Sequence, residues 1–136
     1  MINNINIKPG YKLTEIGVVP EDWSVFKLKE FADVSSGGTP NRTIATYWNG
    51  DIPWITTTMI DFNRIKNAEE FITPEGLKNS ASKMFKTGTL LMAMYGQGKT
   101  RGQITELMIE ACTNQACAAI RLYMFDDFHR KYVKLF

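Results

Sequence analysis

A glycine-rich basic segment that follows a mostly apolar run constrains the fold of this chain more than any other part of it. Residues 89–91 are Thr-Leu-Leu, and residues 92–102 then carry three glycines, one lysine and one arginine. One interpretation is a phosphate loop, because Ala93, four residues and the Gly-Lys-Thr at 98–100 fit a relaxed form of that pattern. The other is a flexible basic loop between two strands that faces DNA. A helix must follow the loop in the first case and a strand in the second.

The surrounding sequence favours the strand-to-strand loop. Gly102 stands where the first helical turn would be, at a cost of about 1 kcal/mol relative to alanine. The mononucleotide fold also alternates parallel strands with helices, and only one short helix is expected between Pro53 and Thr89. A small phosphate-loop-like nucleotide-binding protein that uses Gly98-Lys99-Thr100 remains the alternative.

Strands are predicted through most of the chain. Aromatic and β-branched residues indicate strands at 25–28, 53–59, 89–95, 103–109 and 116–123. A short helix should begin at Pro74, which suits the first helical position, with Thr73 as its cap. We expect residues 1–20 to wrap over the domain as an ordered arm. The predicted fold is α+β (mixed α/β), with a strongly twisted, mainly antiparallel β-sheet core and a few short helices.

The last residues predict the start of a long C-terminal helix. Apolar side chains recur on one helical face, at spacings i, i+4, i+7 and i+8: Phe128, Tyr132, Leu135 and Phe136. The chain looks cut where this helix begins, so we assign residues 1–125 to one domain and residues 126–136 to the start of the helix. Exposed apolar residues of the helix would favour self-association.

Composition excludes several classes of protein. The 136 residues are 44% hydrophobic and 22% charged, which is typical of one globular domain. No run approaches the ~20 apolar residues of a membrane-spanning helix, and the first residues lack the features of a signal peptide. Cys112 and Cys117, with His129 as the only histidine, do not suit a closed zinc site. We expect a cytoplasmic, non-catalytic chain with no metal, no cofactor, no membrane partner and two buried, reduced thiols.

Charge is distributed unevenly, although the net charge is only +2. Residues 76–105 contain no aspartate or glutamate but five cationic side chains, which suits a polyanion partner such as DNA. Lysine and arginine bind phosphates, and arginine, glutamine and threonine also contact base edges. Phosphate contacts are expected from Lys83, Lys86, Lys99 and Arg101, and base contacts from Arg42, Gln97, Thr100 and Arg101; Thr39 completes the predicted DNA-binding residues.

A series of short landmarks covers nearly the whole chain. It begins with residues 11–23 (YKLTEIGVVPEDW), Gly37-Gly38-Thr39-Pro40, Tyr47-Trp48 and Gly50-Asp51-Ile52-Pro53-Trp54-Ile55. It continues with Ile72-Thr73, Gly76-Leu77, Gly88-Thr89-Leu90-Leu91, Tyr95-Gly96, Gly98-Lys99-Thr100 and Thr113-Asn114-Gln115-Ala116. In this order the set resembles the specificity subunits of type I restriction–modification systems.

The resemblance implies a target recognition domain that binds one half of a split double-stranded DNA site. A full subunit of that family has two such domains, joined by long antiparallel helices that dock methyltransferase (modification) subunits. The methyltransferase and restriction subunits carry the chemistry, so the resemblance implies that this chain directs them to the target without catalysis of its own. In that family residues 98–100 belong to a recognition loop. Base-contacting residues vary with the target, so the predicted DNA-binding residues rest on side-chain chemistry.

Overall fold

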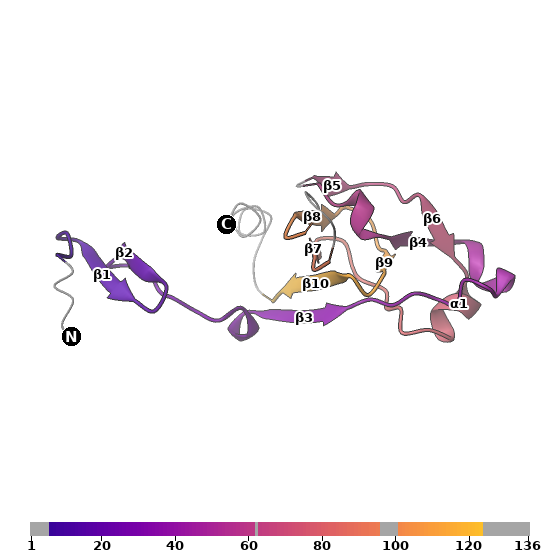
Figure 1. Ribbon diagram of the computed structural model, residues 1–136, viewed down its shortest axis with the longest axis horizontal. Helices are drawn as coiled ribbons and strands as arrows, with labels where there is room; N and C mark the ends of the chain where they lie inside the picture. The colour runs from indigo at the N-terminus through magenta and orange to yellow at the C-terminus, as the bar shows by residue number, and fades with distance from the viewer. Residues whose placement is uncertain (1–5, 62, 96–100, 124–136) are drawn as a thin grey trace.

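Two β-sheets and a separate hairpin organise the chain (Figure 1). The computed structural model describes residues 6–61, 63–95 and 101–123. The five-stranded sheet has the order β3 (Ala32–Ser36), β10 (Cys117–Leu122), β7 (Leu90–Ala93), β8 (Ile104–Leu107) and β5 (Arg64–Ile65). The three-stranded sheet has the order β6 (Glu70–Ile72), β4 (Trp48–Ile55) and β9 (Cys112–Thr113). Among the described strands, the pairs β5–β8 and β4–β9 are parallel and the remaining pairs are antiparallel.

The helices in the described ranges are short: η1 (Leu28–Glu30), η2 (Ala45–Tyr47), η3 (Thr57–Met59) and α1 (Pro74–Lys78). Helix α1 begins as predicted, because Pro74 opens it and the Thr73 hydroxyl accepts a hydrogen bond from the Gly76 amide over 3.1 Å. None of these helices has the length and apolar character needed to cross a membrane. The predicted mixed α/β, mainly antiparallel fold class is confirmed; the helix predicted at 126–136 lies outside the described residues.

The core follows the alternation of side chains along the strands. In β7, Leu91 and Ala93 belong to a buried cluster that also contains Ile55 of the other sheet. Their neighbour Leu90 belongs instead to a second cluster, with Ile120 of β10. Apolar residues therefore cover both faces of the five-stranded sheet, and the cluster on one face reaches Ile55 of the three-stranded sheet.

Two local predictions are wrong. Residues 25–28 do not form a strand; the chain instead makes the turn η1, and β3 begins only at Ala32, where it can pair with β10. The strand predicted at 53–59 begins earlier, at Trp48, and ends at Ile55. The residues after Ile55 form η3, where the Ile60 amide donates to Thr57 O. This amide is therefore used in a helical turn and not in a hydrogen bond between strands.

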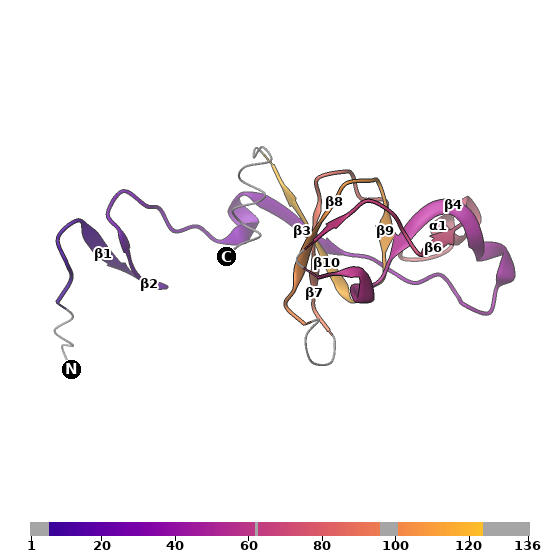
Figure 2. The same cartoon turned by 90° about the horizontal axis from the view of Figure 1, so that it is seen from above.

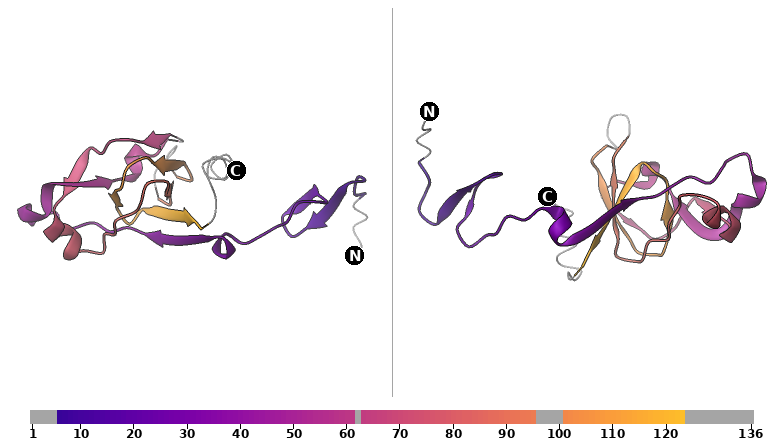
Figure 3. Two further views of the ribbon diagram at one scale, coloured as in Figure 1. Left: turned by 180° about the vertical axis from the view of Figure 1, so that it is seen from behind. Right: turned by 90° about the horizontal axis from the view of Figure 1, so that it is seen from below.

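The N-terminal arm does not wrap over the domain. Strands β1 (Tyr11–Thr14) and β2 (Gly17–Pro20) pair with each other in a hairpin that stands apart from both sheets in Figures 1, 2 and 3. Two apolar residues of this arm, Tyr11 and Ile16, are 43% and 72% exposed, so they do not anchor it to the domain. The hairpin satisfies its hydrogen bonds internally, with the Thr14 hydroxyl donating to Gly17 O over 2.7 Å, so its backbone does not require the sheets as partners.

Candidate nucleic-acid interface

The glycine-rich loop joins two antiparallel strands. Strand β7 leads into it and β8 leaves it, with Met92 opposite Ile104. Gly102 has a φ of 82°, and its amide donates to Ala93 O over 2.8 Å, which closes the hairpin on the β8 side. A strand stands where a phosphate loop requires a helix, so the nucleotide-binding alternative is wrong for this segment.

Among the predicted contacts in this loop, the structure describes one. Arg101 is exposed beside Gly102, at the end of the β7–β8 hairpin. Gln97, Lys99 and Thr100 lie outside the described residues. Arg101 is therefore available at the surface for a phosphate or base contact.

The loop after β3 is fixed by close backbone approaches. A Cβ atom on Gly38 would lie 2.6 Å from the carbonyl carbon of Ala81, so only glycine fits without displacement. Gly38 N donates to Thr113 O over 2.9 Å. Further along the loop, the Thr39 hydroxyl donates to Gln115 Oε1 over 2.6 Å. Thr39, a predicted DNA contact, thus holds this loop to the segment between β9 and β10.

Arg42 is held in a cluster with two tryptophans and a glutamate. Its Nη1 atom lies 2.6 Å from Glu70 Oε1. The guanidinium carbon lies 4.2 Å from the ring centroid of Trp48 and 5.0 Å from that of Trp54. The two indoles contact each other edge-to-face, with their centroids 5.1 Å apart. The Arg42 side chain is still 55% exposed, so the cluster presents a fixed cation at the surface.

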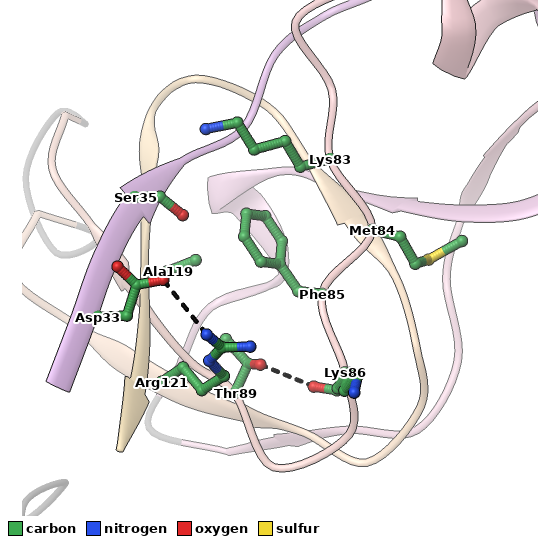
Figure 4. A pocket seen from close by; sticks show the side chains of 9 residues that line it. All are labelled: Asp33, Ser35, Lys83, Met84, Phe85, Lys86, Thr89, Ala119 and Arg121. Atoms are coloured by element: carbon green, nitrogen blue, oxygen red, sulfur yellow. Dashed lines mark hydrogen bonds and ion pairs between the residues drawn. The ribbon is translucent and has the colours of Figure 1, made fainter. Parts of the chain in front are cut away.

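Lys83 and Lys86 lie together around one hollow of about 390 Å³, shown in Figure 4. Strand β3 contributes Asp33 and β10 contributes Arg121, whose Nη2 atom lies 3.6 Å from Asp33 Oδ2. The aromatic ring of Phe85 points into the space between them (Figure 4). The two lysines predicted from the acid-free segment thus share a site with a third cation.

Arg121 and Asp33 are not among the DNA-binding residues predicted from the sequence. A signal was present, because Arg121 is the only cation in the predicted strand 116–123 and follows Ala119 at the spacing of one strand face. Among the described residues, the contacts do not join the predicted groups into one cluster. Lys83 and Lys86 share the hollow, Arg42 belongs to the tryptophan cluster, and Arg101 ends the β7–β8 hairpin.

The two cysteines are buried and free, as predicted. Burial raises the pKa of the Cys112 thiol to about 11 and that of the Cys117 thiol to about 12. Both thiols therefore stay protonated at neutral pH, which makes them poor nucleophiles and poor metal ligands. Over the described ranges, no group of three or more His, Cys, Asp or Glu side chains is placed to hold a metal ion.

Curated relatives of this chain are specificity subunits. The chain is 39% identical over 85 residues to the type I restriction enzyme MjaIX specificity subunit of Methanocaldococcus jannaschii, a match that covers 60% of this chain and 20% of the relative. It is 28% identical over 68 residues to the EcoR124I/EcoR124II specificity subunit of Escherichia coli, with 49% of this chain and 17% of the relative covered. The matches thus span about a fifth of the length of these relatives.

Solved structures share the fold. The HsdS subunit from Thermoanaerobacter tengcongensis superposes with a TM-score of 0.64 at 15% identity, over 93% of this chain and 31% of that one. A chain from a structural study of the assembly and conformational transition of the type I R-M system gives a TM-score of 0.61 at 17% identity, over 86% of this chain and 28% of that one. The family model described as type I restriction modification DNA specificity domain matches residues 20–134. The chain therefore belongs to the type I restriction modification DNA specificity domain family.

Proposed function

We propose that this chain recognises DNA sequence, as the target recognition domain of a type I restriction–modification specificity subunit. The observation that carries the proposal is the family match over residues 20–134, which includes both sheets and the segment of Lys83 and Lys86. The acid-free stretch at 76–105 supports it, because its cations suit a polyanion. The antiparallel β7–β8 hairpin supports it too, because such a loop can meet a duplex and lacks the helix N-terminus on which a phosphate loop holds its nucleotide.

The proposal extends to the protein of which this domain is a part. There the domain binds one half of a split double-stranded target and directs the modification (methyltransferase) and restriction subunits to it. This chain supplies recognition, and its partner subunits supply catalysis. We assign residues 1–125 to the DNA-binding domain and propose, from the sequence pattern alone, that residues 126–136 begin a helix whose apolar face would also allow self-association. We also propose that the chain works in the cytoplasm.

The proposed contacts divide by chemistry. Phosphate contacts come from Lys83, Lys86, Lys99 and Arg101, and base contacts from Arg42, Gln97, Thr100 and Arg101, with Thr39 supporting its loop. Arg42 is supported as a base contact by its fixed position, because a guanidinium stacked on Trp48 loses less side-chain entropy when it binds a guanine edge. A bidentate pair of this kind contributes about 1–3 kcal/mol of discrimination.

Selection from a pool of random-sequence duplexes tests the proposal. The chain is incubated with the pool at low salt, bound duplexes are recovered over several rounds, and the recovered sequences are compared. A short shared motif is expected, and affinity for it should fall steeply as salt rises, because phosphate binding releases counterions. Binding without any enriched motif, or no binding at low salt, would overturn the proposed function.

A nucleotide-binding measurement separates this function from its rival. Calorimetric titration of the chain with ATP and Mg²⁺ is expected to give no saturable binding. Tight, magnesium-dependent binding that is lost in Lys99→Ala would instead restore the nucleotide-binding interpretation. Lys12→Ala, on the N-terminal hairpin, is the matched control for removal of a lysine.

A further inference from the structure

The hollow between β3, β10 and the segment after α1 forms where one sheet face changes from apolar to charged. Asp33 lies directly opposite Arg121 in the register of β3 and β10, and Ser35 lies opposite Ala119. All four residues line the hollow, so they share one face of the sheet. Ala119 is also part of the main core, at 1% exposure. The hollow thus lies where the main core meets the surface, and one of its walls is the face of β3 and β10 that carries these polar side chains.

The opposite wall is held in place by its backbone. Phe85 exchanges two hydrogen bonds with Ala111, at 2.9 and 3.1 Å. Thr89 donates to Lys86 O through its amide over 3.1 Å and through its hydroxyl over 2.7 Å. These bonds hold the backbone at Phe85 and Lys86, and the two lysines of this wall lie on either side of Phe85 in Figure 4.

The charges around the hollow favour an anion. Three cations, Lys83, Lys86 and Arg121, line the hollow together with one carboxylate, Asp33. The Arg121–Asp33 pair is weak, because its N–O separation is 3.6 Å and its side chains are 57% and 54% exposed. An incoming anion can therefore take Arg121 from Asp33 at little cost and gain the two lysines as well.

We propose that this hollow is a binding site for the phosphodiester backbone of DNA, with Arg121 as its third cation and Asp33 as the intramolecular group that the phosphate displaces. The inference rests on the proposed function and goes beyond it by assigning roles to two residues outside the acid-free segment. The shape suits a backbone, because charged side chains ring the hollow while the Phe85 ring offers an apolar surface to a deoxyribose. A phosphate contact of this kind carries no sequence information directly, so it would hold the domain on DNA of any sequence.

Salt-dependent binding of a labelled duplex tests this site. Fluorescence anisotropy gives Kd at several salt concentrations for the unaltered chain, Arg121→Gln, the double variant Lys83→Gln/Lys86→Gln, and Asp33→Asn. Arg121→Gln is expected to raise Kd about tenfold at low salt and to reduce the slope of log K against log salt by about 1, the value for one lost phosphate contact. The double variant should reduce the slope by about 2. Asp33→Asn should lower Kd severalfold, and that gain should disappear when Arg121→Gln is added.

Controls separate the site from general charge and from folding. Lys12→Gln removes one positive charge from the distant N-terminal hairpin and should leave the slope unchanged. Urea unfolding of each variant shows whether the fold is intact. A damaged fold would lower affinity without a stepwise loss in the slope of log K against log salt. As a second test, Ser35→Glu adds a carboxylate to the hollow, and this negative charge should weaken DNA binding in a variant that is still folded.

The outcomes distinguish this inference from the proposed function. If the unaltered chain binds duplex DNA but all hollow variants behave like Lys12→Gln, the site is wrong and the function stands. If the unaltered chain binds no DNA, both fall. Inorganic phosphate or a deoxynucleoside monophosphate, added at constant ionic strength, should not displace the duplex at millimolar concentration. Displacement by either, or by polyglutamate as readily as by unlabelled duplex, would assign the hollow to small or general anions and overturn the inference.

Discussion

The indole nitrogen of Trp54 donates a hydrogen bond to the carbonyl oxygen of Gly38 over 3.0 Å. The same oxygen accepts a bond from the Ser82 hydroxyl. Trp54 belongs to β4, Gly38 follows β3 and Ser82 follows α1, so one carbonyl joins three distant parts of the chain. Two of the sequence landmarks, the one that contains Gly38 and the one that contains Trp54, are thus in contact in the fold. The backbone of Gly38 lies against both the Trp54 indole and residues 81–82.

Gly38→Ala is expected to lower the free energy of unfolding by about 1–3 kcal/mol, because its Cβ atom would press on the backbone of Ala81. Urea unfolding followed by tryptophan fluorescence measures the change. Ser36→Ala, at an exposed position of β3, is the matched control and should change the free energy by less than about 0.5 kcal/mol. An unchanged urea midpoint for Gly38→Ala would show that the loop has room that the structure does not give it.

Thr73→Ala is expected to destabilise the domain by about 1 kcal/mol. The Thr73 hydroxyl accepts from the Gly76 amide at the start of α1 and donates to Thr46 O over 2.6 Å, so its loss removes a helix cap and a tie to η2. The same urea assay measures the effect, with exposed Thr87→Ala as control. Thr73→Ser, which keeps the hydroxyl, should restore most of the stability; failure of that rescue would argue against the cap.

The sequence predicted those helices and strands that depend on residues next to each other in the chain. The cap and proline at Thr73 and Pro74 gave α1, and apolar runs gave β7, β8 and β10, because propensity and pairing agree there. The parallel pairs β4–β9 and β5–β8 were not predicted, since they join residues far apart in sequence. The hairpin at β1 and β2 was missed for a related reason: its apolar residues suggested packing, but its hydrogen bonds close within the hairpin itself.

The candidate site was predictable only in part. The absence of acidic residues from 76–105 identified Lys83 and Lys86, because that signal is a property of contiguous sequence. Asp33 and Arg121 are 88 positions apart and meet only through the register of β3 and β10. The contact of Arg42 with Trp48 and Glu70 likewise depends on how the loop after β3 crosses the three-stranded sheet. Composition can therefore identify a charged segment, but it cannot supply the partners that the fold brings to it.

The buried thiols predict a loss of stability at alkaline pH. In the unfolded chain each thiol ionises near pH 9.0, whereas burial raises the pKa to about 11 for Cys112 and about 12 for Cys117. The unfolded state therefore binds fewer protons than the folded state above pH 9. The contribution of each thiol is fully present below pH 9 and is lost as pH rises toward its folded pKa, by about 1.4 kcal/mol per pH unit.

Urea unfolding at pH 7.5, 9.5 and 10.5 under reducing conditions measures this loss. Lysines and tyrosines also titrate in this range, so the double variant Cys112→Ala/Cys117→Ala is the reference. Its absolute stability differs, but its decline with pH should be shallower than that of the unaltered chain. Equal declines in the two proteins would mean that the folded state exposes its thiols to solvent.

Glu70→Gln is expected to tighten DNA binding through Arg42. Glu70 Oε1 lies 2.6 Å from Arg42 Nη1, so the carboxylate competes with any phosphate or guanine edge for that guanidinium. Removing its charge should lower Kd severalfold in the anisotropy assay, while the stacking of Arg42 on Trp48 keeps the guanidinium in place. A general gain in positive field would also tighten binding, so Arg42→Gln is combined with Glu70→Gln. If Arg42 contacts DNA, the gain disappears in the double variant; if the gain persists undiminished, Arg42 is a structural residue of the tryptophan cluster and does not contact DNA.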